Sequence, residues 1–151
     1  MVRLLALMAV LAAATAAERP RLFGLKNIAV MISADPDGDL DRDRLRLLAA
    51  SKVREAGIRV DPKSKSHLNV IIGVSTIRTG QGLDLGYAYS INLSVSQQVY
   101  LAHNPNRMTD AVTWQTQYLG IASAAELNRK CEQILTRRLD EFVAVYLEGM
   151  D

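Results

Sequence analysis

The fifteen residues from Tyr87 to Leu101 constrain the fold more than any other stretch of this chain. Apolar side chains occupy the odd positions of YAYSINLSVSQQVYL and small or polar side chains the even positions, and only Gln97 breaks the apolar row. A period of two is typical of a β-strand with one buried face. We therefore expect a long strand that is covered on one side and presents an uncharged polar surface on the other.

The remaining elements are marked by shorter patterns. Apolar runs rich in β-branched residues predict further strands, and apolar side chains at helical spacing predict two helices. The expected strands are 27–33, a short segment at 58–60, 67–78 and 111–121, and the expected helices are 41–56 and 123–149. Residues 79–86 and 102–110 are expected to be loops.

This order, β-α-(β)-β-β-β-α, predicts an α+β fold. The first crossover passes through a helix, so the first strands should be parallel, whereas the later three are joined by connections short enough for an antiparallel meander. Each helix has one apolar stripe. We expect a two-layer sandwich in which a mixed, mostly antiparallel sheet carries both helices on one face.

Both helices have recognisable start signals. Asp41 is expected to cap the first helix, and Gly57 follows its end. Ser123 and Glu126 have the spacing of a capping box, in which the serine caps a backbone N–H and the glutamate reaches back to another. The second helix is therefore expected to start at Ser123.

The first 17 residues resemble a secretory signal peptide. Arg3 precedes an uncharged apolar run, and small residues follow around Ala14 and Ala16. The run is too short for a permanent membrane anchor, which is the alternative interpretation. No cysteine lies near the expected cleavage point, so lipid attachment there is not expected. We predict a signal peptide at 1–17, a single α/β domain at 18–151, a periplasmic or secreted location, and no stable membrane insertion after cleavage.

Composition excludes some functions. The formal net charge is +2 and the basic residues are scattered, so no nucleic-acid partner is expected. Cys131 is the only cysteine and occupies an apolar helical position. We interpret it as a small buried hydrophobic residue. An intermolecular disulfide or a reactive thiol are the alternatives.

The candidate binding residues lie on the polar face of the two longest predicted strands. If both helices cover one face of the sheet, the other face is solvated or bound to a partner. On the last strand either Thr113, Gln115 and Gln117 or Trp114, Thr116 and Tyr118 can face outward, and we favour Trp114 and Tyr118 inward because of their apolar bulk. The proposed partner-binding residues are Asn92, Ser94, Ser96, Gln98, Gln115 and Gln117.

Several segments resemble catalytic or metal-binding motifs but lack residues that those motifs require. Residues 35–46 start like a calcium loop, but Leu40 replaces the required glycine and Arg46 the required glutamate. The glycines of 80–86 do not have phosphate-loop spacing. His67 and His103 lack neighbouring ligands, and no nucleophile elbow is present. We predict no catalytic residues, no metal site and no cofactor.

The whole ordered pattern is similar to a group of small exported bacterial proteins of unknown function. The segments AGIRV, YAYSINLS, TWQTQYLG and the closing helix carry the resemblance. More distantly, the order of elements resembles the TolB amino-terminal domain and related envelope lipoprotein domains. Those domains are non-enzymatic binding modules of the envelope. The signal peptide, the uncharged polar strand face and the lack of a catalytic cluster lead us to expect a non-enzymatic binding or accessory module of the bacterial cell envelope that acts through its sheet face or edge, with an envelope protein or a second copy as its partner. A small hydrolase built around His67 and His103, or a homo-oligomeric structural protein, are the alternatives.

Overall fold

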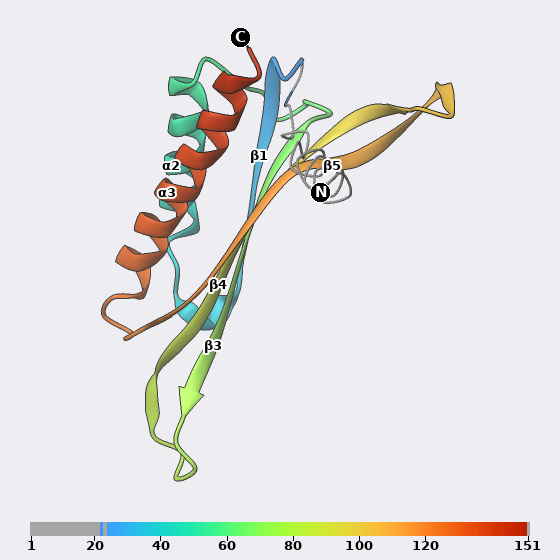
Figure 1. Ribbon diagram of the computed structural model, residues 1–151. Coiled ribbons are helices and arrows are strands. Elements are labelled where there is room, and N and C mark those ends of the chain that lie inside the picture. Colours follow the sequence, from blue (N-terminus) through green and yellow to red (C-terminus); the bar gives the residue numbers. More distant parts are fainter. Residues whose placement is uncertain (1–21, 23, 151) are drawn as a thin grey trace, which may run out of the picture.

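A computed structural model describes residues 22 and 24–150, so the predicted signal peptide at 1–17 lies outside the described residues. The elements in chain order are β1 (Asn27–Ala34), the 3₁₀ helix η1 (Pro36–Gly38), α2 (Arg42–Glu55), β2 (Arg59–Val60), β3 (His67–Arg78), β4 (Asp84–Leu101), β5 (Asn104–Ala122) and α3 (Leu127–Glu148). The five strands form one sheet in the order β2-β1-β3-β4-β5. Both helices lie on the same side of this sheet (Figure 1). The predicted α+β, two-layer fold is confirmed.

The strand directions also follow the prediction. β1 pairs in parallel with both β2 and β3, and the β3–β4 and β4–β5 pairs are antiparallel. The connection through α2 accounts for the parallel pairs, because parallel neighbours need a crossover. β2 and β5 are the edge strands. The first is two residues long and the second nineteen, so β5 is the longer edge strand.

The core forms where the alternating face of the sheet meets the helical stripes. On β4, Tyr89, Ile91, Leu93 and Val95 are at most 3% exposed. α3 contributes six buried side chains at helical spacing, which are Leu127, Cys131, Leu135, Leu139, Phe142 and Tyr146. Trp114 of β5 packs against Phe142 with ring centroids 5.5 Å apart. The expectation that Trp114 faces the helices is therefore confirmed.

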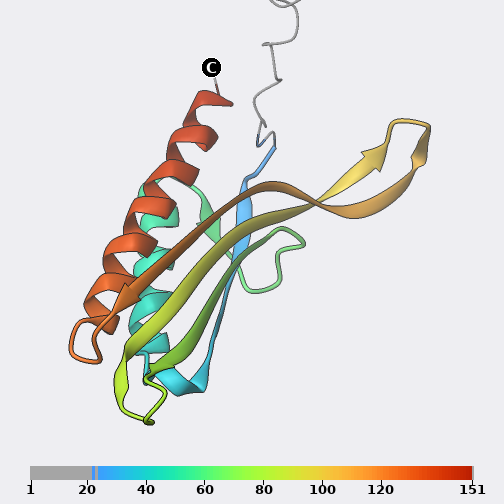
Figure 2. The ribbon, with the colours of Figure 1, turned by 60° about the horizontal axis from the view of Figure 1, so that its bottom comes forward.

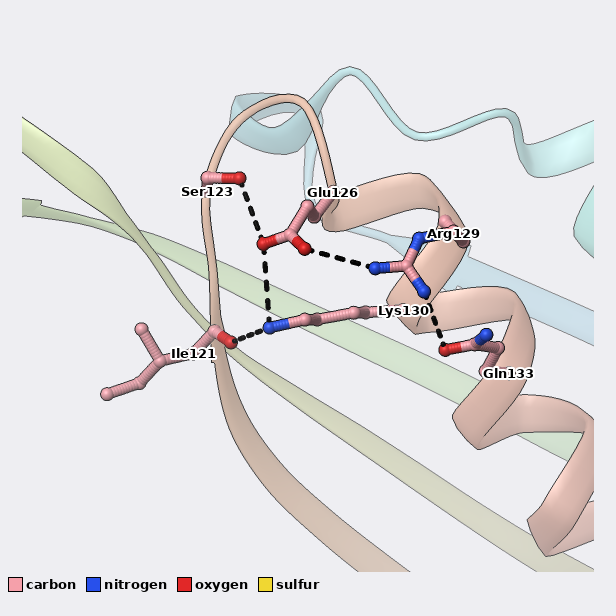
Figure 3. Close-up of polar contacts among 6 residues, drawn as sticks. All are labelled: Ile121, Ser123, Glu126, Arg129, Lys130 and Gln133. Carbon is pink, nitrogen blue, oxygen red and sulfur yellow. Dashed lines mark hydrogen bonds and ion pairs between the residues drawn. The ribbon is translucent and has the colours of Figure 1, made fainter.

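The start of α2 agrees with the prediction and the start of α3 does not. The Asp41 side chain accepts a hydrogen bond from the Arg44 amide at 3.0 Å, as expected for an N-cap. Ser123, by contrast, donates its hydroxyl hydrogen bond to the Glu126 carboxylate at 3.1 Å. α3 starts four residues later, at Leu127, with Glu126 at its N-cap position and no side-chain capping hydrogen bond. Figure 3 shows this contact.

The acidic turn before α2 has a packing role. Gly38 is buried, and a Cβ added there would lie 2.9 Å from Val74 and 3.0 Å from Leu127. Asn128 of α3 holds the same turn, since its side chain accepts from the Asp41 amide and donates to the Asp39 carbonyl. The turn that resembles a calcium loop is thus clamped between the sheet and α3.

Gln97, the one polar residue in the apolar row of β4, is explained by a β-bulge. The register shifts between Val95 and Ser96 so that Thr113 is an extra residue on β5. The Thr113 hydroxyl lies 2.8 Å from the Gln97 side-chain oxygen and 3.3 Å from the Val95 carbonyl. The bulge therefore gives the buried side-chain amide of Gln97 a hydrogen-bond partner. It also takes Thr113 out of the outward-facing series with Gln115 and Gln117, and Val112 occupies the outward position instead.

The loop predicted at 102–110 is wrong. β4 continues to Leu101 and β5 begins at Asn104, so the two strands form a hairpin that turns at Ala102 and His103. This end of the hairpin projects beyond the rest of the sheet (Figures 1 and 2). We refer to residues 97–110 as the arm. Asn-Pro favours a turn, but β5 is an edge strand, where proline is tolerated.

Candidate functional site

The side of the sheet opposite the helices is the candidate site. Strand alternation assigns its members, because each residue shares its face with those two positions away and with its cross-strand partners. This outer face consists of Ala29, Met31 and Ser33 from β1; His67, Asn69, Ile71, Gly73 and Ser75 from β3; Ala88, Ser90, Asn92, Ser94 and Ser96 from β4; and Val112, Gln115, Gln117, Leu119 and Ile121 from β5. No described helix lies over it (Figures 1 and 2).

The structure brings most of the predicted binding residues together. Asn92 pairs with Gln117 across β4 and β5, and Ser94 pairs with Gln115. Ser96 is near enough to Asn69 of β3 for a 3.4 Å hydrogen bond. These side chains form a polar stripe at the centre of the outer face.

Gln98 lies apart from that stripe. It pairs with Asp110 in the arm, beyond the bulge, and is exposed there. The register therefore places this predicted residue on the projecting hairpin, one step past Ser96.

Exposed apolar residues flank the polar stripe, and the sequence analysis missed them. On β5, Leu119 is 70% exposed and Ile121 69%, and on the opposite side Met31 is 54% and Ile71 52% exposed. The same alternation that places Gln115 and Gln117 outward could have assigned Leu119 and Ile121 to this face. The outer face is thus more apolar than expected.

The outer face carries no Asp, Glu, Lys or Arg among the residues that define it. His67 is the only titratable side chain in the set. A partner can therefore dock without removing a full charge of this chain from water, which is otherwise costly.

The edge of β5 borders this face. At one end, Lys130 donates from Nζ to the Ile121 carbonyl at 3.1 Å and lies 3.7 Å from the Glu126 carboxylate (Figure 3). The hydroxyl of Ser123 and then the charge of Lys130 lower the pKa of Glu126 below its usual range. At the other end, a hollow of about 360 Å³ is lined by Val112, Thr113, Trp114 and Gln115.

Two arginine side chains of α3 lie on the helix side of this edge. The Arg137 and Arg138 guanidinium carbons lie 5.5 and 5.8 Å from the centre of the Tyr118 ring, within the range of a cation–π contact. Arg138 is also paired with Glu141 at 2.8 Å. Arg137 is exposed and has no acidic partner within the part of the chain that the structure describes.

The residues considered for catalysis are not assembled into a site. His67 starts β3 on the outer face, whereas His103 lies at the tip of the arm (Figure 1). Residues 22 and 24–150 contain no group of three or more His, Cys, Asp or Glu side chains placed to hold a metal ion. Cys131 is fully buried, which confirms that assignment, and burial raises the pKa of its thiol to about 11.

Within the described residues, no helix is both long enough and apolar enough to cross a membrane. No family model matches the chain, and the comparison with curated proteins found no match either.

Similar solved structures include the PelC dodecamer from Paraburkholderia phytofirmans, at 14% identity and a TM-score of 0.45 over 74% of this chain and 83% of that one. The rare lipoprotein B from Shewanella oneidensis has 16% identity and a TM-score of 0.29, with 81% and 92% covered. A minor lipoprotein from Acinetobacter baumannii has 7% identity and a TM-score of 0.37, with 80% and 91% covered. Two of these three structures are of lipoproteins.

Proposed function

We propose that this protein is a non-enzymatic accessory module of the bacterial cell envelope that binds a protein partner through its outer face. The observation that carries the proposal is the surface itself: a charge-free sheet face with a polar central stripe and exposed aliphatic side chains on both sides. Interfaces combine an apolar core with hydrogen-bonding groups and are depleted in charged residues, as this face is. The location, periplasmic or secreted, rests on the signal-peptide pattern at residues 1–17.

The composition of the face suits protein recognition. Leu119, Ile121, Met31 and Ile71 supply apolar area, and the amides of Asn92 and Gln117 supply hydrogen bonds between them. Interfaces combine such apolar contact with about one hydrogen bond per 100–200 Å². Four strands at about 4.8 Å spacing and nine residues at about 3.3 Å rise give a face of roughly 570 Å². That is less than the roughly 800 Å² that one partner contributes to a typical stable complex, so the partner should also contact the adjacent edge or arm.

Site-specific photo-crosslinking in the native cell envelope tests the proposal. The crosslinker replaces Ser94 at the centre of the outer face, and a control carries it at Leu47, which is exposed on the helix side. We expect one dominant adduct from Ser94, none of the same size from Leu47, and its loss when Asn92→Lys adds a charge to the face. The same adduct from both positions, or one that survives Asn92→Lys, would remove the outer face as the site.

A further inference from the structure

The edge of β5 offers unpaired backbone groups. Lys130 binds the Ile121 carbonyl from outside the sheet, so that carbonyl points away from β4. The Ala122 carbonyl points the other way, since a Cβ added to Gly86 of β4 would lie 2.7 Å from it. Backbone groups alternate in direction along a strand. Gln115, Gln117 and Leu119 therefore present their N–H and C=O groups to the open edge, as Ile121 does.

Two features limit this open edge. The bulge at Thr113 interrupts the regular strand at one end, and Lys130 occupies the Ile121 carbonyl at the other. Among the described residues, no backbone group outside the β4–β5 ladder bonds to β5 between these limits. The interval has the length of a short extended peptide, and the hollow beside Trp114 lies at its start.

The two sides of the edge differ in chemistry. On the outer face the strand carries Leu119 and Ile121, which are largely exposed and favour aliphatic neighbours across the strands. On the helix side it carries Tyr118 with the unpaired Arg137 beside it. A neighbouring strand that suits both sides has aliphatic side chains on one face and a carboxylate on the other.

We propose that the Gln115–Ile121 edge binds an extended segment of a partner protein by strand addition, with an acidic residue next to Arg137 and aliphatic residues next to Leu119 and Ile121. The proposal rests on the proposed function and names the chemistry of its partner. Main-chain hydrogen bonds provide the affinity in this mode of binding, and the alternating side chains provide the specificity. The hollow lined by Val112, Thr113, Trp114 and Gln115 accepts one side chain of the added segment.

Charge disfavours a second copy of this chain as the occupant. If two β5 edges paired antiparallel about a twofold axis, both copies of α3 would lie on the same side of the joined sheet. The two Arg137 side chains would then approach each other, and neither would gain a carboxylate. Like charges brought together at an interface weaken it. An acidic partner segment removes this repulsion and pairs the charge.

The test uses a synthetic acetylated peptide that alternates valine with glutamate, compared with one that alternates valine with lysine. Trp114, the only tryptophan, borders the hollow, so its fluorescence reports docking, and calorimetry measures the affinity. We expect the glutamate peptide to bind and the lysine peptide not to. Arg137→Gln should weaken binding by up to about fivefold, the effect of one exposed ion pair.

Gln117→Pro tests the backbone part of the proposal. The Gln117 N–H points outward, so proline removes an edge donor without breaking the β4–β5 ladder, and edge strands tolerate proline. Binding should fall by about tenfold, and Leu47→Ala, on the exposed side of α2 and away from the edge, should leave it unchanged. If Gln117→Pro does not fold, a peptide N-methylated on alternate residues replaces it and should fail to bind.

The proposal would be overturned if the glutamate peptide did not bind, or if the lysine peptide bound as tightly as the glutamate peptide. It would also be overturned if Gln117→Pro bound the glutamate peptide as tightly as the wild type does, or if the N-methylated peptide bound as tightly as the unmethylated one. A fourth contrary result is concentration-dependent dimerisation that Gln117→Pro abolishes. Because the peptide assay depends on the β5 edge and does not involve Ser94, it can fail while crosslinking at Ser94 succeeds. A negative result for strand addition at the β5 edge can therefore be told apart from a negative result for partner binding by the outer face.

Discussion

Leu119→Ala and Leu93→Ala make the same chemical change on opposite faces of the sheet. Leu93 is 1% exposed in the core, and Leu119 is 70% exposed on the outer face. Full burial of a leucine side chain is worth about 2 kcal/mol, so the buried third of Leu119 contributes roughly 0.6 kcal/mol. Truncation of a core leucine costs about 2–5 kcal/mol, because a cavity is added to the lost burial. We expect Leu119→Ala to lower the free energy of unfolding by less than about 1 kcal/mol and Leu93→Ala by at least twice as much.

Urea denaturation followed by Trp114 fluorescence measures both variants. With a urea dependence of about 1.5 kcal/mol per molar, Leu119→Ala should shift the midpoint by roughly 0.4 M and Leu93→Ala by more than about 1 M. The reasoning is refuted if Leu119→Ala costs as much as Leu93→Ala. A loss that grows with protein concentration would show that the outer face is already buried between copies of this chain.

Three further predictions follow from the interior and the helix contacts. Gly38→Ala forces a Cβ to within 3.0 Å of neighbouring side chains and should cost about 1–3 kcal/mol of unfolding free energy, whereas Gly80→Ala, with open space around it, should change the urea midpoint little. Cys131, with its pKa raised to about 11, should not react with a thiol reagent at pH 8 until urea unfolds the chain; rapid labelling of the native protein would contradict its burial. Lys52 is 2.8 Å from Asp140, and the hydrogen bond and charge of this carboxylate raise the lysine pKa above 10.5. The stabilisation from this ion pair is therefore fully present below pH 10.5 and is lost as the pH rises through the raised pKa. Lys52→Arg keeps its charge there, so its Tm should fall less than that of the wild type above pH 10.5; parallel Tm curves would exclude the ion pair as a contributor.

The fold could be predicted because its signals are local and repeated. The alternation of residues 87–101 corresponds to β4, and the capping aspartate Asp41 to the start of α2. The predicted order of elements is the observed one. The prediction failed where a side chain made a different contact from the expected one, and where strand pairing overrode local composition. The Ser123 hydroxyl bonds to the Glu126 carboxylate, and only the Ser123 main-chain carbonyl accepts from the start of α3. The pairing of β4 with β5 extends both strands through a segment with the composition of a loop.

The candidate site could be predicted only in part. The polar residues of β4 and β5 were assigned to the outer face from their own alternation, and the structure places them there. The contribution of Met31 and Ile71 depends on β1 and β3 lying beside β4, which no pattern within a single strand reveals. The bulge at Thr113 also could not be predicted, since it depends on the pairing of Gln97 with the opposite strand.

The six buried side chains of α3 have a consequence for how the chain is made. Residues 127–146 supply the cover for β4 and β5, including the contact between Phe142 and Trp114. A nascent chain that lacks them exposes the apolar side of both long strands and has no core to close. Folding must therefore wait until the final helix has left the ribosome.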